Sequence, residues 1–320
     1  GNVEIANLLQ FHKVDYLAVA FIDEGIELRR AGIHLPIMVL NPDPSSFGPM
    51  LDYQLEPEVY SLAVIKTLHE LAHYREIKDY PIHVKLDTGM HRLGFQEKNL
   101  EQLIPYLGLP EFRVASVFSH LAGSGEEEHD DFSSEQISRL TRQASKIRKA
   151  IGSSFDLHML NSAGIERFPQ AQFDMVRLGI GLHGIGSAAQ LKPVSAFKTT
   201  ISQIRNLEKG DSVGYSRKGI VERSSKSATI PVGYADGLDR RFGNGQGSVW
   251  IKGKAAPSVG EICMDMTMID VTGLDVSEGD EVEIFGKHQN VSSLASRLGT
   301  IPYEILTAIP ERVKRVYLQE

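Results

Sequence analysis

Polar side chains follow four short apolar runs in the first 180 residues, and each run is of the kind that forms a buried strand. At the ends of parallel strands such side chains would meet at one rim, where (β/α) barrels carry their chemistry. Histidine transfers protons near neutral pH, whereas lysine and arginine bind anions. The candidate residues are, in chain order, Lys85, Asp87, Arg92, Ser119, His120, Asn161, Ser162, Arg177, Gly179 and Ile180.

Each candidate also has a purely structural interpretation. A lone His120 is more often a hydrogen-bonded structural histidine, and Ser162 could be only a helix N-cap. Arg92 and Arg177 could lie in buried ion pairs. Convergence on one rim favours function, because Ser162 and the backbone of residues 179–180 would offer a phosphate a hydroxyl and free N–H groups. The residues alone therefore predict a barrel that binds a phosphorylated ligand.

Two tyrosines in glycine-containing segments are candidates in the second half of the chain, Tyr215 in SVGYSRKG and Tyr234 in PVGYADG. Either could instead serve packing in a sheet. Met264 would ordinarily fill a core, and Cys263 has no partner cysteine for a metal site. The acidic stretch 126–131 is interpreted as a solvated loop, with metal binding as the weaker alternative, and no metal site is predicted.

Helix-like and strand-like segments alternate from residue 1 to about residue 190. Because parallel strands need crossover connections, this alternation predicts a doubly wound sheet or a (β/α) barrel. Seven strands are counted and the chain opens with a helix, so the first strand of a TIM-type (β/α)8 barrel is expected before Gly1. Helices are expected at 2–12, 23–32, 58–75, 97–107, 134–151 and 161–168, and strands at 14–21, 35–40, 51–55, 82–86, 112–118, 155–159 and 173–178.

The pattern changes after about Pro193. Short β-rich runs separated by Gly- and Asp-rich turns predict an antiparallel β domain. The predicted domains are a barrel over residues 1–192 and a β domain over residues 193–320. Strands are expected within 197–207, 227–235, 248–253, 258–271, 280–286 and 313–319, and helices at 291–298 and 302–309.

The composition is that of a soluble globular protein, with 42% hydrophobic and 23% charged residues. A net charge of -7 without a long cationic run argues against a nucleic-acid or membrane partner. Cys263 is the single cysteine, so an intrachain disulfide is impossible and a reducing, cytoplasmic compartment is expected. No apolar stretch approaches the roughly 20 residues of a transmembrane helix.

Seven segments together resemble successive signatures of the pyridoxal-phosphate-dependent alanine racemases of fold type III. They are VKLDTGMHRLGF, FSHLAGS, HMLNSAG, DMVRLGIGLHG, VGYSRKG, IPVGYADG and VGEICMDMTMIDVT, in this order. One segment would be weak evidence, but seven in register cover essentially the whole chain. The resemblance implies a (β/α) barrel with a C-terminal β domain, in a head-to-tail homodimer whose active sites each combine a barrel with the partner's β domain.

The resemblance also implies roles for single residues. Arg177 would face the pyridine nitrogen of pyridoxal phosphate and, because arginine does not readily lose its proton, would leave that nitrogen unprotonated. Tyr215 would be the base on the L face of the substrate, with His120 next to it and Arg177 beyond. Ser162, Asn161, Gly179, Ile180 and Arg92 would bind the cofactor, Met264 and Arg92 the substrate, Lys85 would be carbamylated and orient Arg92, and Tyr234 and Arg240 would line the entrance.

The chain departs from the family pattern at three places. The Schiff-base lysine of the family, in a motif of the type K-A-x-x-Y-G, would stand just before Gly1, together with a phosphate-binding tyrosine. We therefore expect the 320 residues by themselves to form no covalent bond with the cofactor and to be inactive. Glu261 stands where many relatives have an entrance arginine, and Glu311 where many have a tyrosine near the phosphate. A carboxylate there is unfavourable unless Arg312 or Arg315 screens it.

The favoured hypothesis is an alanine racemase that interconverts L- and D-alanine by a two-base mechanism and supplies D-alanine for peptidoglycan. Proton removal on one face and return on the other require two bases, of which Tyr215 is present. One alternative is a cofactor-binding or interaction module without racemase activity, against which the retained Arg92, His120 and Arg177 argue. Another alternative, left open by Glu261 and Glu311, is an amino-acid racemase of broad specificity.

Overall fold

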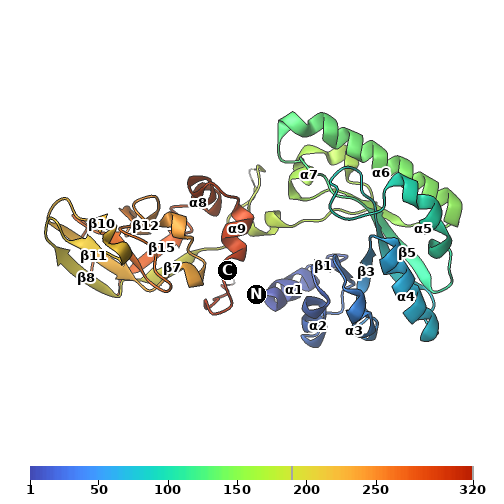
Figure 1. Ribbon diagram of the computed structural model, residues 1–320, viewed down its shortest axis with the longest axis horizontal. Helices are drawn as coiled ribbons and strands as arrows, with labels where there is room; N and C mark the ends of the chain where they lie inside the picture. Colours follow the sequence, from blue (N-terminus) through green and yellow to red (C-terminus); the bar gives the residue numbers. More distant parts are fainter. Residues whose placement is uncertain (189, 319–320) are drawn as a thin grey trace. The chain divides into compact units, whose positions relative to one another are not determined.

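The computed structural model describes residues 1–188 and 190–318. The chain forms two compact units, Gly1–Gly179 and Ile180–Glu320 (Figure 1). Each unit has a hydrophobic core of its own. None of the described helices has the length and apolar character that crossing a membrane would require.

A parallel sheet of six strands forms the first unit. The strands pair in sequence order, and every pair is parallel, as the alternation of helices and strands predicts. This barrel-like sheet confirms the expected (β/α) architecture. The strands are β1 (Leu17–Val19), β2 (Ile37–Val39), β3 (Glu56–Val59), β4 (Tyr80–Lys85), β5 (Phe112–Phe118) and β6 (Asp156–His158).

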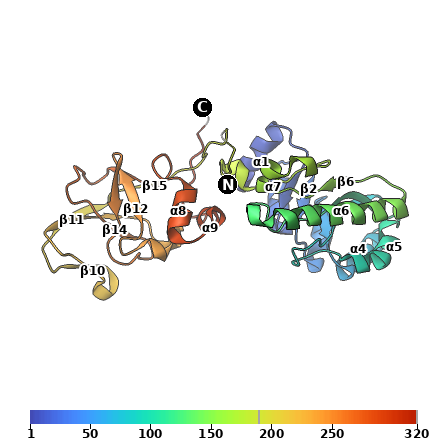
Figure 2. The ribbon, with the colours of Figure 1, turned by 90° about the horizontal axis from the view of Figure 1, so that it is seen from above.

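Helices connect successive strands of the first unit. Helices α1 to α6 pack each against the next, and Figure 2 shows α4, α5 and α6 side by side. Their apolar faces are buried and include Leu68, Leu103 and Leu140, none of which is exposed. The helices are α1 (Asn2–Phe11), α2 (Ile22–Arg30), α3 (Phe47–Asp52), α4 (Leu62–Tyr74), α5 (Leu100–Leu107), α6 (Asp130–Ile151) and α7 (Ser162–Arg167).

The expected strand at 51–55 is wrong. Residues 51–52 close helix α3, Gln54 has a positive φ of 52° that turns the chain, and the strand begins at Glu56. Helix α4 starts later than expected because Ser61 caps it, with the Ser61 hydroxyl accepting from the Val64 amide. The periodicity identified the right elements here but misplaced both by a few residues.

The expected strand at 173–178 is also wrong. Only Met175 pairs there, in an isolated parallel bridge with His158. Phe173 has a positive φ of 51°, and the Leu157 amide donates to the Asp174 carboxylate and not to a backbone carbonyl. The amides of Asp174 and Arg177 donate to the carbonyls of Leu157 and Leu160, so backbone bonds form without a regular strand. The described sheet therefore has six strands where seven were expected.

Antiparallel strands make up the second unit, as its turn-rich sequence predicts. One sheet has the order β14-β11-β8 and another the order β13-β12-β15-β7, and β9 pairs with β10. The strands are β7 (Phe197–Thr200), β8 (Gln203–Leu207), β9 (Ser212–Val213), β10 (Gly219–Ile220), β11 (Ser225–Ile230), β12 (Ser248–Ile251), β13 (Lys254–Pro257), β14 (Thr267–Asp270) and β15 (Glu281–Phe285).

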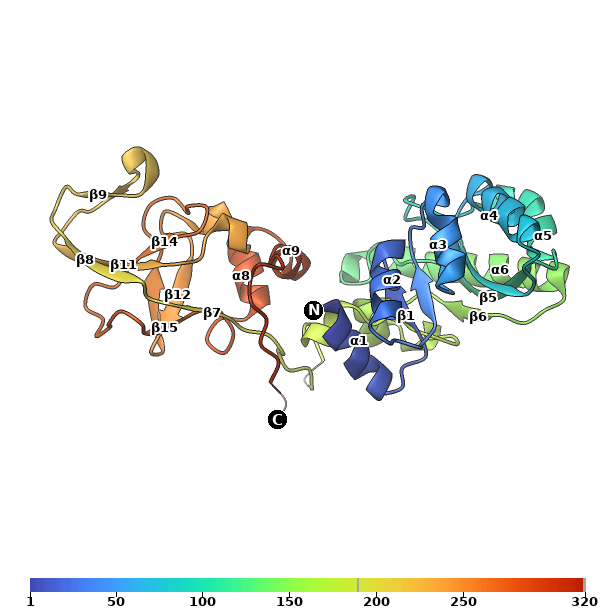
Figure 3. The same ribbon diagram turned by 90° about the horizontal axis from the view of Figure 1, so that it is seen from below.

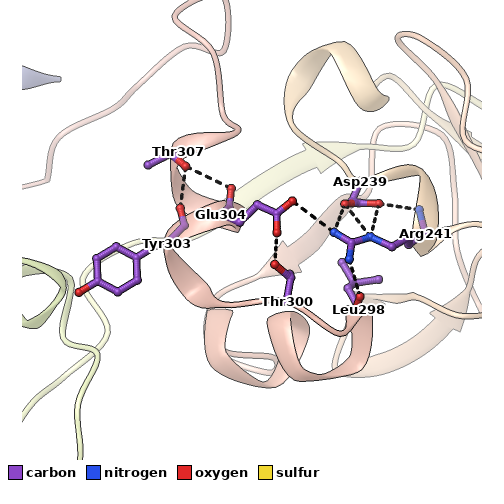
Figure 4. A network of polar contacts seen from close by, with 7 residues as sticks. All are labelled: Asp239, Arg241, Leu298, Thr300, Tyr303, Glu304 and Thr307. Atoms are coloured by element: carbon purple, nitrogen blue, oxygen red, sulfur yellow. Dashed lines mark hydrogen bonds and ion pairs between the residues drawn. The ribbon is translucent and has the colours of Figure 1, made fainter. Parts of the chain in front are cut away.

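Two helices, α8 (Val291–Leu298) and α9 (Pro302–Thr307), lie side by side after the last strand (Figure 3). Arg241 ties them to the preceding turn, because its guanidinium contacts Asp239, Glu304 and the carbonyl of Leu298 (Figure 4). The expected strand at 313–319 is wrong over residues 313–318, which form no strand, and residue 319 lies outside the described residues.

Candidate active site

Polar side chains occupy one face of the parallel sheet. Residues two apart on a strand share a face, and strand pairing sets His83 opposite both Glu58 and Ser116. Phe118 lies opposite His158 and stacks on its ring, with centroids 4.7 Å apart. Barrel interiors usually hold apolar layers, so this buried polar face marks a functional region.

Arg177 joins the carboxyl ends of β5 and β6. Its Nη2 donates to the carbonyl of Ser119 at 2.7 Å and to that of Met159 at 3.1 Å. The same nitrogen lies 3.1 Å from Nδ1 of His120, and Nη1 lies 2.5 Å from Nδ1 of His158. Four acceptors from two strand ends thus fix one guanidinium, as expected if these ends converge.

Arg177 determines the protonation of both histidines. A guanidinium can only donate, so Nδ1 of His120 and Nδ1 of His158 must accept, and in each neutral ring the proton lies on Nε2. Burial, followed by the charge of Arg177, lowers the pKa of His120 to about 4. The same causes hold the pKa of His158 well below its ordinary value. Burial also lowers the pKa of Arg177 to about 10, against the opposing charge of Glu58. His120 is therefore a neutral donor through Nε2–H.

Lys85 pairs with a buried carboxylate that sequence reasoning missed. Its Nζ lies 3.1 Å from Oε1 of Glu58, whose side chain is fully buried, and 5.4 Å above the ring of Phe118. Burial raises the pKa of Glu58 to about 7, and burial lowers the pKa of Lys85, in each case against the charge of the partner. The i,i+2 spacing of Glu56 and Glu58 could have indicated two carboxylates on one face of a strand. The strand was expected at 51–55, so these two residues were placed outside it.

Stability should depend on pH through Glu58. Its pKa is about 7 when folded and near the ordinary 4.5 when unfolded, so the folded protein binds more protons between these pH values. The free energy of unfolding is expected to fall as the pH rises from about 4.5 to about 7, by at most roughly 1.4 kcal/mol per pH unit. Urea unfolding at a series of pH values should show this slope in the wild type and in the exposed control Glu101→Gln, but not in Glu58→Gln. Equal slopes in all three proteins would contradict the assignment.

Asp87 and Arg92, which follow β4, differ in whether their side chains have partners within the chain. The Asp87 carboxylate accepts from the amides of Gly89 and His91 and lies 2.8 Å from Nδ1 of His91, so it shapes the turn. Arg92 is exposed, and its side chain makes no hydrogen bond or ion pair with any described residue. Arg92 is therefore available to a ligand, whereas Asp87 has a structural role.

A serine hydroxyl and a backbone amide meet beside β6. The Gly179 amide donates to Oγ of Ser162 at 3.0 Å, and Ile180 follows directly as the start of a 3-10 turn over Ile180–His183. Asn161, rather than Ser162, caps α7, since its Oδ1 accepts from the Gly164 amide at 2.9 Å. Ser162 is therefore not the N-cap, and a hydroxyl beside the Gly179 amide has the donor chemistry that a phosphate needs.

Tyr215 stands out from the second unit. It follows Gly214, whose φ is 77°, and the next two residues, Ser216 and Arg217, also have positive φ. This turn leaves Tyr215 71% exposed. The loop that carries the exposed Met264 lies against the Tyr234 segment, because the Ala235 amide donates to the carbonyl of Met264 at 2.9 Å.

Glu261 lies between two cations. Its carboxylate is 2.6 Å from Nζ of Lys218 and 2.9 Å from Nη2 of Arg240, and it accepts from Nδ2 of Asn244. Hydrogen bonds from Lys218, Asn244 and Arg240 lower its pKa to about 2. A cavity of about 620 Å³ is lined by Arg240, Arg241, Gly243, Asn244, Gln246, Glu261, Arg297 and Leu298, so two of the expected entrance positions border an open space.

The arginines expected to screen Glu311 have other partners. Arg312 pairs with Asp236 at 2.7 Å, and Arg315 donates to backbone carbonyls of residues 309, 310 and 313. Among the described residues Glu311 forms no ion pair. The acidic stretch is a 3-10 turn over Glu127–His129 and the start of α6 rather than a loop, and its exposed His129 pairs with Glu126 at 3.2 Å.

Comparisons with known families match both halves of the chain. The family described as "Alanine racemase, N-terminal domain" matches residues 1–187, and "Alanine racemase, C-terminal domain" matches residues 194–317. "Alanine racemase 2" of Caldanaerobacter subterraneus subsp. tengcongensis is 38% identical over 99% of this chain and 85% of its own.

Solved structures give the same result. An alanine racemase of Clostridium difficile 630 is 35% identical, with a TM-score of 0.92 over 99% of this chain and 85% of that one. An alanine racemase from Bartonella henselae, described with covalently bound pyridoxal phosphate, is 31% identical, with a TM-score of 0.91 over 99% of this chain and 89% of that one. Sequence and fold therefore agree on one family.

Proposed function

The chain belongs to the alanine racemase family, whose reaction interconverts L- and D-alanine with pyridoxal phosphate, and we propose that Arg177, His120 and Tyr215 carry its proton transfer. The observation that supports this assignment best is the pair of hydrogen bonds from Arg177 to His120 and His158. These bonds leave His120 neutral with an Nε2–H available to a phenolic oxygen.

Tyr215 is the proposed base on the L face of the substrate. Its oxygen would take the proton from Cα of L-alanine and return one to Cα in the reverse reaction. A phenolate is a strong enough base, and a hydrogen bond from Nε2–H of His120 would stabilise it. In the proposed head-to-tail homodimer this tyrosine comes from the partner subunit, which accounts for its exposure in a single chain.

The residues beside β6 fit the phosphate of the cofactor. The Oγ of Ser162 and the amides of Gly179 and Ile180 would hold it, with Asn161 supporting the turn as an N-cap. Arg177 would face the pyridine nitrogen, and Arg92 would bind the phenolic oxygen and the substrate together with Met264. When bound, pyridoxal phosphate withdraws electrons from Cα and so makes its proton acidic.

The state of Lys85 depends on Glu58. A carbamate forms when the neutral Nζ bonds to the carbon of CO2 and a proton is released, which would place a second anion beside a buried carboxylate. We propose that Lys85 is carbamylated only where Glu58 is neutral. With 13C-labelled bicarbonate, the carbamate carbon resonance should be stronger in Glu58→Gln than in the wild type and absent in Lys85→Met. Equal signals in the first two proteins would exclude this dependence.

The remaining features concern the entrance to the site, the domain boundary and the compartment in which the enzyme acts. Tyr234 and Arg240 line the entrance. There Glu261, which stands at the position of an arginine in many relatives, forms an ion pair with Arg240. The proposed domain boundary lies between residues 192 and 193, beyond the division of the two compact units after Gly179. The enzyme acts in the cytoplasm, where D-alanine is made for peptidoglycan, and its one cysteine, Cys263, is consistent with a reducing compartment.

Substrate breadth follows from the entrance. The test measures turnover of L-alanine, L-serine and L-lysine by the full-length protein loaded with pyridoxal phosphate. We expect kcat/KM to be highest for alanine, with D-alanine as the product. Equal turnover of serine or lysine would support the alternative of a broad-specificity racemase, and pyridoxal phosphate binding without any turnover would support a non-catalytic module.

A further inference from the structure

A line of hydrogen bonds continues from His158 across the sheet. On the side of its ring away from Arg177, Nε2 of His158 lies 2.9 Å from Oγ of Ser116. That hydroxyl lies 2.7 Å from Nδ1 of His83, and Nε2 of His83 lies 2.8 Å from Oε2 of Glu56. The line thus links a residue of each of the four neighbouring strands β3 to β6.

The direction of every bond in this line is fixed by its two ends. Arg177 can only donate, so His158 accepts at Nδ1 and donates from Nε2 to Ser116. The hydroxyl of Ser116 then donates to Nδ1 of His83, and the Nε2–H of His83 donates to Glu56, whose carboxylate can only accept. His158, Ser116 and His83 each use one donor and one acceptor, and none of the three is left unsatisfied.

The line also runs obliquely across the sheet, from near the amino ends of the strands towards their carboxyl ends. Glu56 lies two residues before Glu58, the strand partner of His83, and so nearer the amino ends of the strands. His158 lies two residues beyond the strand partner of Ser116, and so nearer the carboxyl ends. The charge of Glu56, near the amino ends of the strands, is thereby connected to the groups at the carboxyl ends, where the proposed chemistry takes place.

Burial makes these bonds strong. His83, Ser116 and His158 are at most 1% exposed, and the side chain of Glu56 is 12% exposed. Tyr16 packs edge-on against the ring of His83, and burial, followed by the charge of Glu56 and a hydrogen bond with it, raises the pKa of Tyr16 to about 12. Tyr16 is thus a neutral phenol, and Glu56 is the acceptor at this end of the line.

We propose that Glu56, His83 and Ser116 are positioning residues that hold His158 in its Nε2–H form and thereby orient Arg177. This proposal rests on the role assigned to Arg177 in the proposed function. A His158 protonated at Nδ1 would turn an N–H towards the guanidinium. The negative end at Glu56 favours the opposite arrangement along the whole line, because polarised hydrogen bonds strengthen one another.

The direct test is 15N–1H spectroscopy of the imidazole groups in the full-length protein. The wild type is expected to show Nε2–H resonances for both His83 and His158. Glu56→Gln, which keeps the shape but removes the charge, should move both resonances, although Glu56 contacts His83 and Tyr16 and not His158. A shift confined to His83 would overturn the relay, since a merely local contact would produce it.

Kinetics provide the second readout. Ser116→Ala interrupts the line and is expected to lower kcat for L-alanine about tenfold with less than about twofold change in KM. Glu56→Gln should lower kcat in the same way, by a smaller factor. The matched control is Ser133→Ala, which removes a buried hydroxyl that has no partner among the described residues. It should change neither kcat nor the imidazole resonances.

The outcomes separate this proposal from the proposed function. Wild-type kcat in both Ser116→Ala and Glu56→Gln would overturn the positioning role, even with racemase activity intact. If the wild type racemised no amino acid, the function of the site would fail, while the paired shifts at His83 and His158 would still show the relay. Glu56→Gln changes a partly exposed group and so keeps the test valid if Ser116→Ala does not fold.

Discussion

Replacing Tyr215 by phenylalanine is expected to lower kcat for L-alanine by about 10²- to 10⁴-fold, the range typical of a lost general base. The phenolic oxygen is the proposed proton acceptor, and the ring that remains would still fill its place in the site. KM should therefore change little. Because Tyr215 is 71% exposed in the single chain, the unfolding free energy should change by less than about 0.5 kcal/mol.

Tyr74→Phe is the matched control, because Tyr74 is exposed and lies at the end of α4, away from the proposed chemistry. This variant should racemise alanine at the wild-type rate. Initial rates of D-alanine formation measure both proteins under the same conditions. A Tyr215→Phe enzyme with more than a tenth of wild-type kcat would remove Tyr215 from the role of base.

Arg177→Gln is expected to abolish activity and to lower stability together. The substitution leaves Nδ1 of His120, Nδ1 of His158 and two carbonyls without their common donor. Each unsatisfied buried acceptor costs about 1–3 kcal/mol, so a total loss of several kcal/mol is expected. Without the guanidinium, His120 also loses the contact that fixes its proton on Nε2.

Urea unfolding and kcat measure the two effects of Arg177→Gln. The control is Arg113→Gln, which removes an exposed guanidinium that pairs with Asp79 at 3.6 Å. Exposed pairs contribute about 0–1 kcal/mol, so this variant should keep both its stability and its activity. Arg177→Gln with wild-type stability would show that the buried bonds at Arg177 do not hold the strand ends together.

The sequence predicted the architecture well where local signals are strong. Helices α1 and α8 and the parallel pairing of β4 with β5 follow from apolar periodicity and from the alternation of elements. The predicted strands were wrong where a short apolar run belongs to a helix end or to a turn. Residues 51–55 are apolar enough for a strand, but the turn at Gln54 is visible only in the backbone. The run 173–178 has a strand composition, yet the Leu157 amide donates to the Asp174 carboxylate and the segment forms no regular strand.

The candidate site was predictable at the strand ends but not inside the sheet. His120 and Ser162 were found because polar residues soon after apolar runs are unusual, and Arg177 because it stands near the end of such a run. His158, His83 and Ser116 lie within the runs themselves, where a polar residue is ordinarily read as facing solvent. Their partnership depends on the register between strands, which no local pattern contains.

The central claim is that this chain's residues exchange the α-proton of alanine. The most direct measurement is proton NMR of L-alanine in D2O with the full-length protein loaded with pyridoxal phosphate. We predict that the Cα–H signal disappears as D-alanine accumulates, until the two enantiomers are equal, because every inversion takes the new hydrogen from solvent. An α-proton that stays in place while the cofactor is bound would contradict the account.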